Sequence, residues 1–217
     1  MESAMKLALI GATGFVGSKI LAEALSRGHQ VTAIVRHPEK LQPQPKLTAK
    51  KGNVYDEVEI AALVAGHDAV ISAFNPGWGD PDIYELHVKG SRAIYAGVKR
   101  AGVKRLLVVG GAGSLEVAPG VQLVDTPHFP AEYKGGARGA REALNLLKRE
   151  TGLDWTFVSP PVFLEPGQRT GTFRVGGDQV LMGPEGPARI SLEDLAMAII
   201  NEIEQPKHGR RRFTVGY

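Results

Sequence analysis

Three glycines near the N-terminus form the clearest chemical pattern in the chain. Gly11, Gly14 and Gly17 follow a short apolar run at 7–10 and precede a stretch with helical apolar periodicity. We therefore expect a strand, a tight turn and the start of a helix. Backbone N–H groups at a helix N-terminus bind phosphate groups, and the helix dipole favours the negative charge there. The pattern predicts a diphosphate-binding turn, with a spacing that is a variant of Gly-x-Gly-x-x-Gly.

Arg36 follows the second expected strand, at 31–35, and bears on the choice between two cofactors. An acid at this point binds the 2′-hydroxyl of NAD, whereas an arginine accommodates the 2′-phosphate of NADP. No acidic residue precedes Arg36 in the strand. Because a guanidinium forms charge-assisted bonds with phosphate, we expect NADP (NADPH) in preference to NAD. A solvated arginine at a strand end is the alternative interpretation.

Further candidate residues follow other expected strands, where ligands of open α/β sheets bind. Residues after the third strand are placed to contact adenine, and those after the fourth to lie along the ribose and diphosphate. The set assigned to the cofactor is Gly11, Thr13, Gly14, Phe15, Val16, Gly17, Arg36, Asn53, Val54, Ala73, Phe74, Asn75, Gly110, Ser159 and Pro160. Ordinary loop residues remain an alternative for those outside the glycine turn.

The elements that must position these residues alternate between strands and helices. Beyond the first two strands, we expect strands at 47–53, 68–73, 103–109 and 154–158, and helices at about 56–65, 82–101 and 131–150. This alternation predicts an α/β Rossmann-like fold, a doubly wound and mostly parallel sheet with helices on both faces. We expect residues 1–217 to form a single domain, with 160–217 contributing a small substrate-side lobe.

The C-terminal region predicts a small extension with a hairpin and a helix. Residues 173–175 and 179–181 flank a Gly-Gly-Asp turn and are expected to form the hairpin. Ser191 is expected to cap the helix, and 213–215 to form a last strand. The apolar stripe expected on that helix consists of Leu192, Leu195, Ala196, Ile199, Ile200 and Ile203.

Several residues are assigned by pattern to the interior or to the surface. Phe15 and Val16 begin the apolar face of the first helix, and Trp155 lies within a strand and is expected in the core. Trp78 lies in a loop, where a stacking platform and an ordinary loop residue are both open. Residues 115–130 are expected to form a surface loop, and the arginines 210–212 a solvated strand end.

Composition excludes several classes of function. The net charge is +3 and the basic residues are scattered, so no nucleic-acid partner is expected. The absence of cysteine excludes disulfides and thiolate chemistry, and the histidines lack metal-ligand spacing, so no metal is expected. No apolar signal-peptide core or membrane-length stretch is found, which makes a cytoplasmic protein without a membrane partner the expectation.

The motifs resemble those of the extended and atypical short-chain dehydrogenase/reductase superfamily. Gly-Ala-Thr-Gly-Phe-Val-Gly at 11–17 and Ala-Gly-Val-Lys-Arg at 101–105 carry this resemblance. The segments 107–115, 154–160, 163–167, 190–196 and 204–208 are similar, more narrowly, to the bacterial NADH-flavin reductases of the NmrA-like group. The resemblance implies a Rossmann-type fold, a bound nicotinamide cofactor, and FMN or FAD as a diffusible acceptor.

The superfamily's proton donor, a tyrosine with a lysine four residues later, does not occur at its usual place. Tyr95 and Lys99 have this spacing, but they lie on the helix before the fifth strand, and we interpret them as coincidence. Tyr133 begins the helix after that strand and has Ala137 in place of lysine. Ser114, near the superfamily's serine, is the catalytic candidate, and a structural turn serine is the alternative.

A site without this dyad suits hydride transfer to a flavin or quinone-like acceptor, because orientation of the two rings controls that step. The favoured function is an NAD(P)H-dependent oxidoreductase acting on such a small-molecule acceptor. A non-catalytic NAD(P)-sensing regulator and a sugar-nucleotide epimerase or dehydratase remain alternatives. Monomer and homodimer both remain open.

Overall fold

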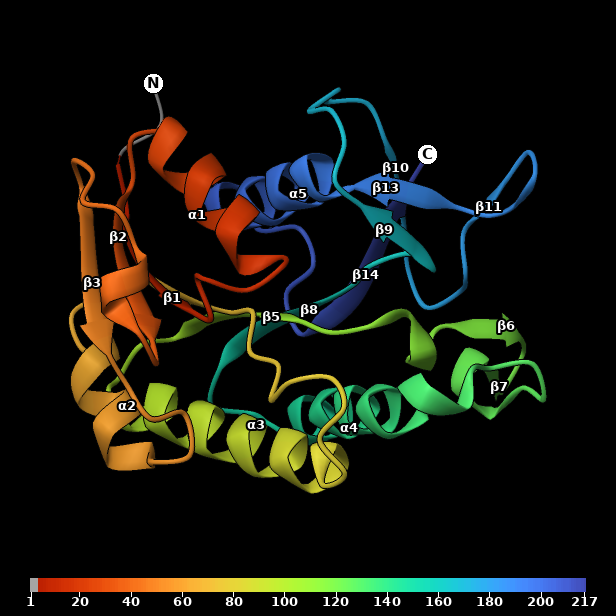
Figure 1. Cartoon of the computed structure of the whole chain (residues 1–217), viewed down its shortest axis with the longest axis horizontal. Coiled ribbons are helices and arrows are strands. Elements are labelled where there is room, and N and C mark those ends of the chain that lie inside the picture. The colour runs from red at the N-terminus through yellow and green to blue at the C-terminus, as the bar shows by residue number, and fades with distance from the viewer. Residues whose placement is uncertain (1–3) are drawn as a thin grey trace.

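A computed structural model describes residues 4–217 of the chain; residues 1–3, part of the segment considered for a signal peptide, lie outside the described residues. Its main feature is an eight-stranded sheet in the order β10-β14-β8-β5-β4-β1-β2-β3 (Figure 1). The strands are β1 (Lys6–Ile10), β2 (Gln30–Val35), β3 (Leu47–Lys51), β4 (Ala69–Ser72), β5 (Arg105–Val109), β8 (Asp154–Ser159), β10 (Arg174–Gly176) and β14 (Arg211–Gly216). All neighbouring strands are parallel except β10, which is antiparallel to β14. The predicted doubly wound, Rossmann-like sheet is confirmed.

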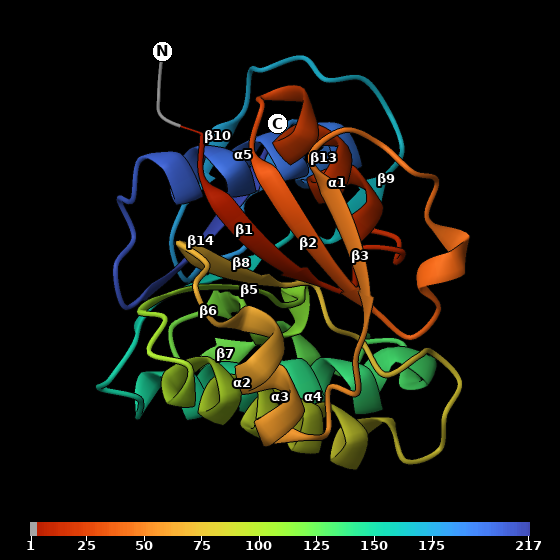
Figure 2. The same ribbon diagram turned by 90° about the vertical axis from the view of Figure 1, so that its left-hand side faces the viewer.

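Helices cover both faces of this sheet, as Figures 1 and 2 show. α1 (Gly17–Ser26) and α5 (Leu192–Glu204) lie on one face, and α2 (Glu57–Val64), α3 (Ile83–Arg100) and α4 (Ala131–Lys148) lie on the other. Each face buries its own cluster of apolar side chains. Such burial is the main favourable contribution to folding.

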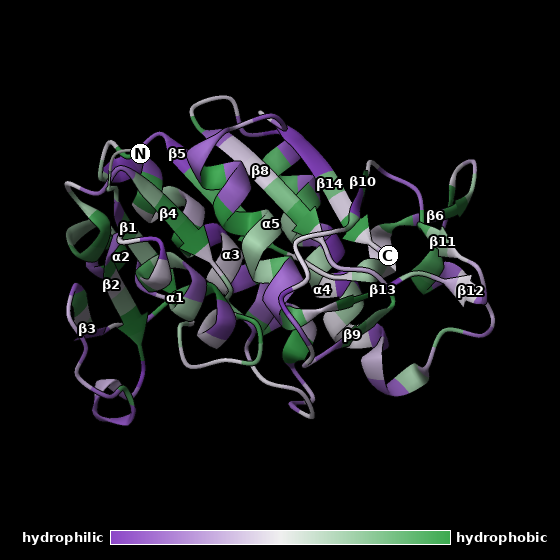
Figure 3. Cartoon of the chain, turned by 90° about the horizontal axis from the view of Figure 1, so that it is seen from above, coloured by the Kyte–Doolittle hydropathy of each residue, from purple (hydrophilic) through white to green (hydrophobic). Residues whose placement is uncertain are grey.

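The strands are apolar where both faces are covered. Every residue of β4 is buried, whereas most of the edge strand β3 is exposed and carries Lys50 and Lys51. Figure 3 shows hydrophobic residues concentrated in the interior around β4 and β8, with hydrophilic residues on the peripheral loops. Lysines on an edge strand oppose pairing with further chains.

The last helix forms as its sequence predicts. Ser191 precedes α5, and its Oγ accepts a hydrogen bond from the N–H of Asp194 at 3.0 Å. This cap satisfies one of the N–H groups that a helix start leaves free. All six residues of the predicted apolar stripe are buried, and α5 packs against α1.

The predicted hairpin at 173–175 and 179–181 is wrong. β10 pairs with β14 at the edge of the large sheet, and Gln179 instead forms a bridge with Glu116. Two long-range contacts replace the local turn: the N–H of Glu116 donates to Asp178 O at 2.8 Å, and the N–H of Val180 donates to Glu116 O at 2.9 Å. The rest of this region pairs as β9 (Phe163–Glu165) with β13 (Arg189–Ser191), and as β11 (Met182–Gly183) with β12 (Gly186–Pro187).

The expectation of a plain surface loop at 115–130 is also wrong. This segment contains the short strands β6 (Glu116–Ala118) and β7 (Val121–Gln122) and a 3-10 helix at Leu123–Asp125. Leu115 and Val124 are completely buried. Val124 lies against Gly113, whose other close neighbour is Ala137 of α4, so the segment is anchored by apolar packing.

Candidate functional site

The glycine turn lies where the ends of β1, β2 and β4 meet. Gly11 has a φ of +81°, its N–H donates to Ile34 O at 3.1 Å, and a Cβ at this position would lie 2.7 Å from Ala73 O. The N–H of Gly14 donates to Gly11 O at 3.0 Å. Only glycine adopts this φ without strain, so the residue type follows from the backbone path.

The turn leaves donors free at the start of α1. Thr13, Gly14 and Phe15 are exposed, and among the described residues the N–H groups of Phe15 and Val16 have no hydrogen-bonding partner. Gly17 is buried against the turn, so that a Cβ there would overlap Gly11 O. Free N–H groups at the positive end of a helix dipole suit a diphosphate.

Phe15 does not lie on the buried face of the helix, and that expectation is wrong. Its side chain is 58% exposed, because α1 begins at Gly17 and Phe15 belongs to the turn before it. Val16 is half-buried and packs against the cluster beneath α1. The exposed ring of Phe15 thus borders the free donors instead of packing in the core.

Two cations converge near the ends of β2 and β3. Arg36 is exposed directly after β2, and the Lys89 Nζ lies 5.4 Å from the centre of the Tyr55 ring. Burial raises the pKa of Tyr55, the positive charge of nearby Arg36 works in the opposite direction, and Asp80 acts with burial. Arg36 and Lys89 therefore both place positive charge near Tyr55.

The remaining adenosine-side candidates shape the loop after β3. Asn53 is exposed, accepts a hydrogen bond from the N–H of Tyr55 at 3.1 Å through Oδ1, and donates its own N–H to Glu59 at 3.2 Å. Val54 is half-buried and packs on the cluster below. Sequence reasoning missed Tyr55, although its position two residues after Asn53, in the same loop, could have indicated it. Nothing in the sequence marked Lys89, because it lies on α3.

Phe74 anchors the loop after β4 beside the glycine turn. The N–H of Ala73 donates to Ile10 O at 2.9 Å, and the Phe74 ring lies against Gly90 of α3. The centre of that ring is 6.0 Å from the centre of the Tyr55 ring and 5.8 Å from that of His87. The Asn75 Oδ1 accepts the N–H of Gly77 at 2.8 Å, which closes a turn. The structure thus places Ala73 and the backbone of Phe74 beside Gly11 of the glycine turn.

His87 of α3 is buried against α4. Burial lowers its pKa to about 4, so the imidazole is neutral at neutral pH. Its Nδ1 lies 3.5 Å from the Ser91 Oγ, and Gly139 of α4 lies against the ring. In the part of the chain that the structure describes, no group of three or more histidine and acidic residues could hold a metal ion. No described helix is long and apolar enough to cross a membrane.

The candidates after β5 and β8, which are Gly110, Ser159 and Pro160, are less exposed than the glycine turn. Gly110 packs on the Phe157 ring, and its N–H donates to Val158 O at 2.8 Å. Ser159 and Pro160 are buried, and within the described residues the Ser159 Oγ has no hydrogen-bonding partner. Contact of these three residues with a cofactor stays a prediction.

Ser114 is buried and already bonded. The Arg212 Nη1 donates to both the Oγ and the carbonyl oxygen of Ser114 at 2.9 Å, and the Arg212 Nη2 lies 2.7 Å from the Asp178 Oδ1. Arg212 is thus a buried, paired residue, and the expectation that all three arginines at 210–212 are solvated is wrong for it. A catalytic role for Ser114 stays a prediction, since its hydroxyl accepts a structural hydrogen bond here.

The tyrosines occupy different environments. Tyr95 is buried in the core, its hydroxyl donates to Ala143 O at 3.3 Å, and burial raises its pKa. Lys99 instead pairs with Glu150 at 3.1 Å. Tyr133 at the start of α4 is 49% exposed, and Ala137, one turn later, is buried.

Tyr133 forms an exposed aromatic pair with Trp78. Their ring centres are 5.4 Å apart at 86°, and Trp78, 60% exposed, leans over Gly136 of α4. The pair joins the loop after β4 to α4 and exposes two aromatic rings set nearly at right angles. Trp155, by contrast, is 4% exposed and belongs to the core, as predicted.

Comparisons with known proteins agree with this geometry. A family model described as NAD(P)H-binding matches residues 11–206. The uncharacterized protein YwnB of Bacillus subtilis is 43% identical over 215 residues, covering 97% of this chain and 98% of its own. The chain spans only 31% of a 3-beta-hydroxysteroid dehydrogenase of Mycolicibacterium neoaurum, at 29% identity over 112 residues.

Solved structures show the same fold along nearly the whole chain. A "putative epimerase" from Bacteroides thetaiotaomicron has a TM-score of 0.93 at 47% identity, covering 99% of this chain and 98% of that one. A "putative NADH-flavin reductase" from Streptococcus pneumoniae has a TM-score of 0.84 at 36% identity, covering 98% and 99%. A short-chain dehydrogenase/reductase from Veillonella parvula, solved with NADP, is 18% identical with a TM-score of 0.75, covers 99% of this chain and 95% of that one, and shows the fold alone.

Proposed function

Since this chain belongs to the NAD(P)H-binding family, we propose that it is an NADPH-dependent reductase whose acceptor is a flavin or a quinone-like ring. The observation that carries the proposal is the exposed glycine turn with free N–H groups at the start of α1. The name of the Streptococcus relative supports a flavin as the acceptor class.

The residues present fit a nicotinamide dinucleotide. A side chain at position 11 or 17 would clash with backbone and distort the turn, and the free donors of Phe15 and Val16 suit the diphosphate. Arg36 and Lys89, both close to Tyr55, supply positive charge for a 2′-phosphate, which supports NADPH over NADH. When bound, the cofactor supplies the hydride.

The protein itself would orient the two reacting rings and shield them from water. Phe74, held against Gly90, limits the space beside the glycine turn and would exclude water from a bound ring. Trp78, on the loop after β4, offers an exposed ring face on which a planar acceptor would stack, with the Tyr133 ring at the start of α4 nearly perpendicular to it. Such stacking fixes the orientation of two rings, which is the main requirement of hydride transfer between them.

A second candidate, an NAD(P)-sensing regulator without turnover, is favoured by the position of Ala137. A short-chain dehydrogenase needs a lysine there to lower the pKa of the catalytic tyrosine, and Ala137 is buried instead. The same observation opposes the sugar-nucleotide epimerase or dehydratase that the name of the Bacteroides relative suggests.

One series of measurements tests the proposal. Purified protein is titrated with NADPH and NADH, and NADPH oxidation is then followed with FMN, FAD and several quinones. Tighter binding of NADPH together with turnover of one acceptor is the expected result. Binding without turnover of any acceptor would favour the regulator, and no binding of either nucleotide would refute the cofactor assignment.

A further inference from the structure

Arg212 of β14 is a buried cation. In the register of β8 and β14 it lies opposite Phe157, whose ring belongs to the apolar cluster beneath α2, α3 and α4. Only 3% of the Arg212 side chain is exposed, although a guanidinium removed from water is unfavourable unless it is paired and hydrogen-bonded. Its burial therefore depends on the bonds that it forms.

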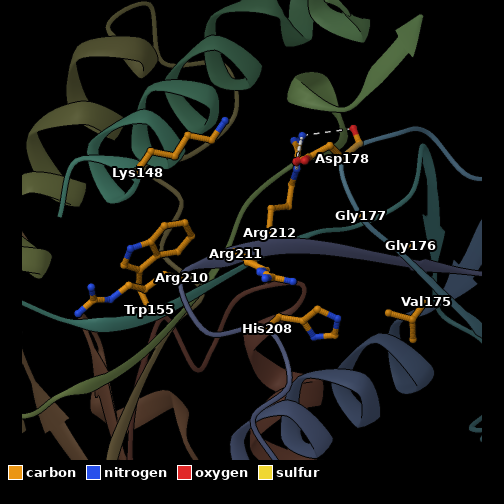
Figure 4. Close-up of a pocket in the computed structure, with 10 residues that line it drawn as sticks. All are labelled: Lys148, Trp155, Val175, Gly176, Gly177, Asp178, His208, Arg210, Arg211 and Arg212. Carbon is orange, nitrogen blue, oxygen red and sulfur yellow. Dashed lines mark hydrogen bonds and ion pairs between the residues drawn. The ribbon is translucent and has the colours of Figure 1, made fainter. Parts of the chain in front are cut away.

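All three nitrogens of this guanidinium are bonded, and they join two distant segments. Nε donates to the Asp178 Oδ1 at 2.8 Å, Nη2 lies 2.7 Å from the same oxygen, and Figure 4 shows the two side chains turned toward one another. Nη1 donates to both the carbonyl oxygen and the Oγ of Ser114 at 2.9 Å. Because the group is a rigid, planar fork, these bonds fix its orientation and hold the Ser114 hydroxyl in place.

Ser114 ends a turn that lies beside the proposed acceptor surface. The turn is the 3-10 helix at Ala112–Ser114, and it packs on α4, since a Cβ on Gly113 would lie 2.8 Å from the Ala137 Cβ. Tyr133 lies four residues before Ala137, so both are on one face of α4. The turn that contains Ser114 therefore lies along the helix face that carries Tyr133.

The Ser114 hydroxyl retains a hydrogen that it can donate. Its oxygen accepts the bond from Arg212, and within residues 4–217 its hydrogen has no acceptor. A bond from a cation to the oxygen polarises the O–H and makes its hydrogen a stronger donor. The oxygen and nitrogen atoms of a flavin or quinone ring gain negative charge as the hydride arrives, and a preorganised donor stabilises such charge.

We propose that Arg212 is a positioning residue for the acceptor reaction, which directs the Ser114 hydroxyl as a hydrogen-bond donor to the acceptor. This inference rests on the proposed reductase function and adds to it the group that stabilises the developing negative charge. The acceptor takes up two electrons with the hydride that the bound cofactor gives up, and Ser114 donates a hydrogen bond to the anion so formed. Water then supplies the proton.

The position of Arg212 at the surface of a hollow allows chemical rescue. Arg212 and Asp178 both line a hollow of about 520 Å³ (Figure 4). Asp178 is 64% exposed, so removal of the arginine leaves its carboxylate in water and creates no unpaired buried charge. Free guanidinium ion can enter this hollow and replace the group that Arg212→Ala removes.

The experiment compares Arg212→Ala, Ser114→Ala and the double variant with the original protein. Arg211→Ala is the matched control, because Arg211 precedes Arg212 in the strand, is exposed and points to the opposite face of the sheet. For each protein we would measure kcat with the acceptor of highest turnover and the Kd for NADPH. The binding of FMN to the NADP complex, followed by flavin fluorescence, is a readout that does not depend on turnover.

Arg212→Ala and Ser114→Ala should each lower kcat about tenfold or more, as expected for loss of a preorganised donor, and leave the Kd for NADPH unchanged. FMN binding should weaken less than kcat falls, because the bond strengthens as charge develops. The double variant should be no slower than Arg212→Ala, since Arg212 acts through Ser114.

Rescue by guanidinium separates positioning from a merely structural role. Guanidinium chloride, far below denaturing concentrations, should raise the kcat of Arg212→Ala and leave that of the double variant unchanged, with urea at the same concentration as the control. Arg212→Lys keeps the charge but lacks the planar fork, so it should also lower kcat. It provides the same test of kcat if Arg212→Ala does not fold.

Three results would overturn this inference alone, in a protein that does reduce an acceptor. These are a kcat of Arg212→Ala equal to that of Arg211→Ala, single-variant effects that multiply in the double variant, and rescue of the double variant by guanidinium. No turnover of any acceptor by the original protein would instead refute the reductase function, and this inference with it.

Discussion

Gly17 packs directly against Gly11, so that a Cβ on Gly17 would overlap the carbonyl oxygen of Gly11. That oxygen also accepts the N–H of Gly14 at 3.0 Å, which ties all three glycines of the motif to one backbone contact. The Gly-x-x-Gly-x-x-Gly spacing is therefore a packing requirement as well as a means of exposing donors.

Gly17→Ala should disrupt this contact. The added methyl group meets backbone, which cannot move aside as a flexible side chain would, so we expect a loss of about 1–3 kcal/mol in the free energy of unfolding. NADPH binding should weaken in parallel. Denaturant unfolding and nucleotide titration check this, with Gly209→Ala, where a Cβ would meet open space, as the control. Unchanged stability in Gly17→Ala would contradict the packing argument.

Arg36→Ala tests the choice of cofactor. Loss of a charged hydrogen bond to the 2′-phosphate should weaken NADPH binding by about 1–3 kcal/mol and leave NADH binding nearly unchanged. Lys89→Ala should act in the same direction, because its ammonium group lies over Tyr55 on the same side of the site. Titration of each variant with both nucleotides is the measurement. An equal loss for NADH and NADPH would rule out the phosphate contact.

Trp78→Ala tests the acceptor surface. If the acceptor ring stacks on the Trp78 ring, the variant should raise the KM for the acceptor roughly three- to tenfold, which corresponds to an aromatic contact. The Kd for NADPH should not change. Val58→Ala, an exposed apolar residue on α2, is the control in steady-state kinetics. A weaker NADPH complex with an unaltered KM for the acceptor would assign Trp78 to the cofactor instead.

His87 predicts how stability depends on pH. Burial lowers its folded-state pKa from 6.5 to about 4, so its neutral form is favoured in the folded protein. Between pH 6.5 and 4 the unfolded chain takes up a proton at this histidine and the folded protein does not. The free energy of unfolding is therefore unaffected by His87 above pH 6.5 and falls progressively as the pH drops toward 4. His87→Gln should remove this loss of stability, which is on the order of 3 kcal/mol.

The measurement is denaturant unfolding at a series of pH values. His128→Gln, at an exposed histidine, should keep the slope of the original protein. A slope that is the same in His87→Gln as in the original protein would show that His87 is not the titrating group.

Features that depend on neighbours in the chain could be predicted from the sequence. The glycine turn, the Ser191 cap and the apolar stripe of α5 arise from contacts within one or two turns, and their spacing records those contacts directly. The alternation of strands and helices likewise led to the parallel sheet, because a crossover helix between parallel strands has few alternatives.

Features that depend on distant segments required the tertiary structure. β10 pairs with β14 and not with its neighbour in sequence, because a strand is more stable at the edge of a large sheet than in an isolated two-stranded hairpin. Arg212 lies 98 residues from Ser114 and is buried against it, although a run of three arginines suggests a solvated end. Lys89 and Tyr55 come together from α3 and the loop after β3. By itself, the sequence determined the glycine turn and the parallel sheet on which it lies. Only the fold decided which charges are paired, because pairing and burial depend on side chains that the chain brings together from far apart.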